Sequence, residues 1–164
     1  MTDFGFSLQE TTEGLIVRIN GILDEESDLD SLDLGKHKVV VFDLAGIKMI
    51  NSLGVRNWII WSRNALRERI VTFRNCPRVI VDQINMVAQF LPEGSRVESF
   101  FTPYQCDNCE ESIATLFQQG REFSLRTSDA PPKIALPHAP NCPNCTSPMT
   151  LDVIEAKYFR FIKL

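Results

Sequence analysis

Four of the five cysteines in this 164-residue chain form two Cys-x-x-Cys pairs. The first pair is Cys106 and Cys109, and the second is Cys142 and Cys145. A Cys-x-x-Cys turn offers two thiolates to one ion, and two such turns complete the tetrahedral site that zinc prefers. Because four thiolates leave no coordination position open, the pattern predicts a structural zinc ion rather than a catalytic one. Redox disulfides and bound iron are the alternatives.

The remaining cysteine and the two histidines indicate no enzyme chemistry. Cys76 stands alone, and a lone cysteine is most often a small buried apolar residue. The histidines, His37 and His138, are not positioned by the sequence to activate it. His138 lies close to the second cysteine pair, where it would be a surplus ligand, and we expect it on the surface. We therefore expect a protein that is not an enzyme.

A second candidate site is the stretch Ile50–Gly54, which reads Ile-Asn-Ser-Leu-Gly. Ser52 falls at an expected helix start, where a Ser or Asn side chain caps a free backbone N–H for about 1 kcal/mol. A phosphoryl group there would add a charge of about −1.5 to −2, which a helix N-terminus tolerates. Two interpretations of Ser52 stay open. It is either an unmodified residue that caps the helix or contacts a partner, or a serine that is phosphorylated. Gly54 indicates either close helix packing or room for a partner, and we expect Trp58 in the core.

Hydrophobic periodicity predicts the elements that must position these residues. Helices are expected at 52–68 and from Pro77 to Leu91, with a short amphipathic helix or turn at 24–35. Strands are expected at 4–10, 14–23, 38–44, 70–74 and 96–103, with 38–44 parallel and central. This alternation predicts an α/β fold with a mixed sheet over residues 1–103.

Residues 104–164 form a separate tail that carries both cysteine pairs. We expect a short helix within 106–120, a strand over 158–163 and little burial, so that zinc would supply on the order of 10–16 kcal/mol of folding energy. The aromatic stretch within 158–163 could stack on nucleic-acid bases, or it could be buried. The tail contains six basic and seven acidic residues, so it has no excess of positive charge to attract nucleic acid. This balance favours burial of the aromatic stretch. A nucleic-acid-binding ribbon with a dimerising α/β domain is the alternative function.

The composition sets the broad class of protein. A hydrophobic share of 44% and a charged share of 23% are typical of a soluble globular protein, and the net charge of −4 disfavours nucleic-acid binding by the whole chain. No apolar stretch reaches membrane-spanning length, and the N-terminal residues do not have the pattern of an export signal. We expect a cytoplasmic protein, and its oligomeric state stays open.

Residues 4–103 resemble a STAS domain, the fold of bacterial anti-anti-sigma factors. The resemblance rests on Gly-Ile-Leu-Asp at 21–24, on a strand ending Asp-Leu-Ala-Gly at 43–46, and on the Asn-Ser-Leu-Gly stretch that opens a helix. It implies a STAS-like mixed sheet packed with helices, with the zinc-ribbon-like tail as an addition.

The resemblance also implies a function. In the family, a partner serine kinase with anti-sigma activity phosphorylates the serine that Ser52 matches. Asn51 stands where the family usually has Asp, and Leu53 stands where it has a small residue. We therefore expect a regulatory or scaffold protein that docks a protein partner through Asp24, Asn51, Ser52, Leu53 and Gly54.

Overall fold

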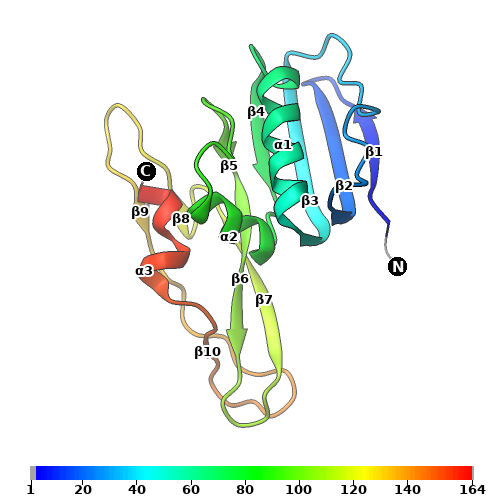
Figure 1. Cartoon of the computed structure of the whole chain (residues 1–164). Helices are drawn as coiled ribbons and strands as arrows, with labels where there is room; N and C mark the ends of the chain where they lie inside the picture. Colours follow the sequence, from blue (N-terminus) through cyan, green and yellow to red (C-terminus); the bar gives the residue numbers. More distant parts are fainter. Residues whose placement is uncertain (1–2, 164) are drawn as a thin grey trace. The chain divides into compact units, whose positions relative to one another are not determined.

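The chain folds into two compact units, residues 1–98 and 99–164, each described by itself below. Figure 1 shows the computed structural model, which describes residues 3–163. The sequence placed the division later, between residues 103 and 104. The reason is that the single strand expected at 96–103 is two strands, and each belongs to a different sheet. No helix among the described residues is long and apolar enough to cross a membrane.

The first unit is built on a five-stranded mixed sheet in the order β1-β2-β3-β4-β5. Strand β1 is antiparallel to β2, and the remaining neighbours are parallel. The central position of β3 and its parallel pairing on both sides agree with the sequence prediction. The strands are β1 (Gly5–Glu10), β2 (Leu15–Leu23), β3 (Val39–Ile50), β4 (Ile70–Arg74) and β5 (Arg96–Val97).

Strand β3 is longer than predicted, because it continues beyond residue 44 and stays paired with β2 through two register shifts. The last pair in this ladder joins Leu23 to Ile50. The N–H of Asn51 then donates to the carbonyl oxygen of Leu23 at 3.1 Å. The ends of β2 and β3 therefore hold the start of the next helix beside the loop that follows β2.

An aromatic cluster forms the core of the first unit. Phe42 on β3 stacks on Phe73 of β4 with ring centroids 5.4 Å apart. Trp58 and Trp61 of helix α1 (Ser52–Ala65) meet Phe42 edge-on at 5.7 and 6.2 Å. The Trp58 indole N–H donates to the carbonyl oxygen of Phe90 at 2.9 Å, so this buried donor is satisfied. Trp58 is only 2% exposed, which confirms its predicted place in the core.

The second helix, α2 (Arg78–Met86), is shorter than the predicted segment from Pro77 to Leu91. It ends because Val87 adopts an extended backbone, with φ −114° and ψ 112°. The carbonyl oxygen of Val87 then accepts the N–H of Phe90 in a turn. This turn places the Phe90 carbonyl where the Trp58 indole reaches it.

Residues 24–35 form turns rather than a helix. The carboxylates of Asp28 and Asp33 accept the backbone N–H groups of Ser31 and Gly35, which stabilises turns at the expense of a helix. Three leucines of this segment are buried and fix it to the unit: Leu29, Leu32 and Leu34.

The second unit contains a three-stranded antiparallel sheet in the order β10-β6-β7 and a separate two-stranded sheet of β8 and β9. The short helix expected within 106–120 is wrong, because β7 pairs with β6 along its whole length. The alternation of Ile113, Thr115 and Phe117 is the strand pattern that this ladder uses. The strands are β6 (Ser99–Gln105), β7 (Ser112–Gln118), β8 (Phe123–Ser124), β9 (Lys133–Ile134) and β10 (Thr150–Leu151).

The second unit has an aromatic core of its own, contrary to the expectation of little burial. Phe100 contacts Phe123 and Phe161 with ring centroids 5.1 Å apart in both pairs, and Phe117 stacks on Phe159 at 5.9 Å. The strand expected at 158–163 is wrong. The chain there forms helix α3 (Glu155–Tyr158) and then a 3₁₀ turn (Arg160–Lys163).

Candidate metal centre and helix-start surface

The first cysteine pair lies in the tight turn that joins β6 to β7. The N–H of Cys106 donates to the carbonyl oxygen of Glu111 at 2.8 Å, and the N–H of Glu110 donates back to the carbonyl oxygen of Cys106 at 2.9 Å. Glu110 takes the left-handed conformation, with φ 63°. The turn is therefore closed by backbone hydrogen bonds and directs two cysteines to one side.

The second cysteine pair repeats this turn. The N–H of Cys142 donates to the carbonyl oxygen of Ser147 at 2.8 Å, and the N–H of Thr146 donates to the carbonyl oxygen of Cys142 at 2.9 Å. Thr146 also has φ 63°. Strand β10 follows this turn and pairs with β6, which leads into the first turn. Two equivalent turns are thus placed side by side by one sheet.

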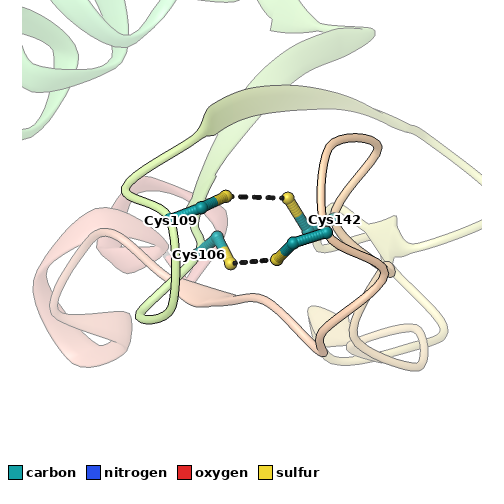
Figure 2. A group of neighbouring side chains, drawn as sticks. Cys106, Cys109 and Cys142 are labelled. Carbon is teal, nitrogen blue, oxygen red and sulfur yellow. Dashed lines mark hydrogen bonds between the residues drawn. The ribbon is translucent and has the colours of Figure 1, made fainter.

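The four sulfur atoms converge on one point. They all lie within 4.8 Å of one another. The sulfur atoms of Cys106 and Cys145 are 3.4 Å apart, and those of Cys109 and Cys142 are 3.5 Å apart. Figure 2 shows Cys109 of the first turn facing Cys142 of the second. Zn–S bonds of about 2.3 Å in a tetrahedron place sulfur atoms about 3.8 Å apart. The cluster can therefore hold a metal ion of this size.

Polar groups around the cluster favour the thiolate of one cysteine, Cys145. The N–H of Asn144 points to the sulfur of Cys142 at 3.4 Å. Hydrogen bonds from the Asn108 side chain and from Ser147 lower the pKa of Cys145 to about 5. The pKa of Cys106 is instead raised to about 11, because the backbone hydrogen bonds from Cys109 and Asn108 that lower it are outweighed by burial and by its sulfur contacts with Cys145 and Cys109. Both Cys-x-x-Cys pairs have asparagine at the third position, a repeat that the sequence itself shows. His138 is exposed, as predicted, and takes no part in the cluster.

The helix-start surface is organised by Asn51, which is the N-cap of α1. Its side-chain oxygen accepts the N–H of Gly54 at 2.8 Å. Its side-chain nitrogen donates to the carboxylate of Glu25 at 2.8 Å, a partner that the sequence did not reveal. Ser52 is the first helical residue and is exposed. Because the Asn51 side chain supplies the cap, the Ser52 hydroxyl is not needed for it.

Two apolar residues close to Ser52 in the sequence are exposed. Leu53 is 44% exposed and Met49 is 55% exposed. Gly54, in contrast, is buried, and a Cβ added there would overlap the carbonyl oxygen of Leu23. Gly54 therefore serves close packing of α1 on the end of β2 rather than contact with a partner.

Asp24 lies beside this surface in the turn after β2. Its carboxylate accepts the N–H of Glu26 at 3.0 Å and the hydroxyl of Ser27 at 3.1 Å. The Ser27 hydroxyl in turn accepts the N–H of Asp24 at 2.9 Å. The Asp24 side chain thus shapes the turn that carries Glu25 to Asn51.

Cys76 is fully buried, as predicted for a small apolar residue. Burial and the nearby charge of Asp43 raise the pKa of the Cys76 thiol far above its ordinary value. The thiolate, which is the nucleophilic form, is therefore strongly disfavoured. Asp43 itself pairs with Arg74 at 3.2 Å.

A scan against protein-family models finds no match to this chain, and a search of curated proteins finds no significant similarity. The chemistry of the two sites is therefore the basis for the function.

Proposed function

We propose that this chain is a non-enzymatic regulatory or scaffold protein whose first unit docks a protein partner and whose second unit is held together by zinc. The observation that carries the docking proposal is that Met49 and Leu53, which precede and follow Ser52 in the sequence, both have exposed apolar side chains. Exposed apolar side chains that form a continuous patch rimmed by polar residues are typical of interaction sites. The docking surface is defined here as Glu25, Met49, Asn51, Ser52 and Leu53.

The resemblance to STAS domains supports the same surface. It assigns Ser52 as the residue that a partner kinase of the anti-sigma type would phosphorylate. The Ser52 hydroxyl is exposed at the start of α1, where a phosphoryl group would gain from the helix dipole. The added negative charge would stand near Glu25 and next to Leu53, so it would alter docking without requiring a change of fold.

The donor set supports zinc as the metal of the second unit. Four cysteine sulfurs at near-tetrahedral spacing match structural zinc sites, in which all positions are filled by protein ligands. Two of the cysteines, Cys106 and Cys142, are buried, which is typical of a closed site. The ion would join the turn between β6 and β7 to the turn before β10.

The alternative function, nucleic-acid binding through the tail, gains no support from the aromatic stretch. Tyr158, Phe159 and Phe161 are all buried in the described structure, so they are not available to stack on bases. Tyr158 also donates from its hydroxyl to the carbonyl oxygen of Phe101.

The docking proposal is tested by comparing two variants of equal exposure. Leu53→Asp places a charge in the docking surface, whereas Leu8→Asp places one on β1 at a side chain that is also 44% exposed. Partners captured from the source cells by the parent should be retained by Leu8→Asp and lost by Leu53→Asp. Retention by both variants would contradict the docking surface. Intact mass of the native protein, with a Ser52→Ala control, reports whether Ser52 is phosphorylated.

A further inference from the structure

Helix α1 carries a one-sided positive charge. Residues 52–67 contain three arginines and no acidic residue. At about 100° of rotation per residue, Arg56 and Arg63 fall on the same side of Ile60, within about 60° of it. Arg67 lies just past the end of α1, in the turn after its C-cap residue Leu66. The three arginines are exposed, and Ile60 is 49% exposed in the middle of the helix. This face of α1 is an apolar ridge with a basic flank.

An acidic groove runs along the other flank of Ile60. It has a volume of about 640 Å³ and lies between α1 and the loop after β2. Ile60 and Trp61 supply apolar lining, and the loop supplies Glu25, Asp28 and Asp30. No basic residue lines the groove. The buried leucines of this loop hold the carboxylates in place, so the negative charge has a fixed position.

The groove therefore fits an apolar side chain flanked by arginines, and α1 itself presents that combination. We propose that two copies of this chain associate through α1, with Ile60 of each copy against the groove of the other. The arginines of one copy then face the carboxylates of the second copy. The contact is isologous, as in most closed dimers.

The distribution of charge also selects the orientation of the two helices. Acidic and basic groups are divided between the two sides of α1, not between its two ends. When two such faces meet, a two-fold axis along the helix places the acidic side of each copy over the basic side of the other. A two-fold axis across the helix would place acid over acid, which is repulsive. The α1 helices in the dimer are therefore parallel.

The test exchanges the charges on each flank separately. The acid-reversed variant is Asp28→Lys with Asp30→Lys, and the base-reversed variant is Arg56→Glu with Arg67→Glu. Arg63 is left unchanged because it donates to Gln89. Analytical ultracentrifugation of the full chain in low salt should give the parent twice the 18.6 kDa of one chain. Each reversed variant alone should sediment as a monomer, and an equal mixture of the two should form a dimer again.

Recovery of the dimer in the mixture also shows that both variants are folded, so a loss of mass cannot be attributed to misfolding. Asp3→Lys with Glu13→Lys, two exposed acids away from the groove, is the matched control and should stay dimeric. A parent that is monomeric at all concentrations would overturn the proposal and leave the groove to a different protein. Reversed variants that stay dimeric, or a mixture that stays monomeric, would overturn it as well.

Discussion

Asn51 uses both halves of its side-chain amide. The oxygen caps α1 by accepting the N–H of Gly54, and the nitrogen donates to Glu25. An aspartate could do only the first, and it would place a second carboxylate against Glu25. An asparagine at position 51 thus has a local physical reason, because its amide gives the Glu25 carboxylate a donor that an aspartate would lack.

The hydrogen bond from Asn51 to Glu25 predicts the effect of replacing Asn51 by aspartate. Asn51→Asp keeps the cap but brings two carboxylates together, so we expect a loss of about 1 kcal/mol in the free energy of unfolding. Glu25→Gln in the same chain should restore most of it, because the glutamine amide can donate to the new carboxylate. Urea unfolding followed by Trp58 and Trp61 emission measures both values. Equal stability of Asn51→Asp with and without Glu25→Gln would contradict the pairing.

The role of Gly54, in the same stretch, could not be decided from the sequence. A glycine in the first turn costs about 1 kcal/mol of helix propensity relative to alanine. Its two explanations, close packing and a partner's approach, predict the same residue type. Only the position of the Leu23 carbonyl, which comes from a different strand, separates them.

At the scale of elements, the first unit was largely predictable because its patterns are long. The helix starting at Ser52, the strand at 70–74 and the apolar central strand all have enough residues for one periodicity to dominate. The end of α2 was not predictable, because the apolar spacing continues through Val87 although the backbone does not.

The second unit was poorly predicted because its segments are short. The stretch 158–163 alternates like a strand, yet Tyr158 and Phe161 are also three apart, as are Phe159 and Ile162. Both pairs are buried, which is the pattern of the tight helical turns that form there. Six residues are too few to decide between the two periods. The cysteine pairs, in contrast, could be recognised at once, because their spacing alone defines the ligand geometry.

The buried aromatic residues of this short segment should contribute strongly to stability. Phe159 is 2% exposed and stacks on Phe117, so Phe159→Ala should cost about 3–5 kcal/mol. Lys157→Ala, at an exposed position of the same segment, is the control and should change stability little. Urea unfolding of the second unit can be followed by the near-ultraviolet circular dichroism of the two tyrosines, because both lie in this unit. A cost below about 1 kcal/mol would show that the aromatic core is not required.

At the scale of the whole molecule, the two units place their cysteines in different surroundings: one thiol is isolated in the first unit, and four are clustered in the second. Cys76 is fully buried in the first unit, and burial together with the nearby charge of Asp43 raises its pKa. The four cysteines of the second unit are brought together by two hydrogen-bonded turns. A thiol reagent can therefore distinguish the two units, because the thiols of each unit should become reactive under a different condition: after metal removal in the second unit and after unfolding in the first.

The expected result is a thiol count that rises in two steps. With metal bound, a maleimide should react slowly with the native chain, since bound thiolates and the buried Cys76 are both protected. A zinc chelator should release four reactive thiols, and a denaturant should release the fifth. Cys76→Ala should remove only the last step, and metal analysis should give one zinc ion per chain. Four thiols that react without a chelator would show that no metal is held. Thiols that appear only after a reductant would show two disulfides in place of the zinc site. The paired sulfur atoms, 3.4 and 3.5 Å apart here, would then have to approach to about 2.05 Å.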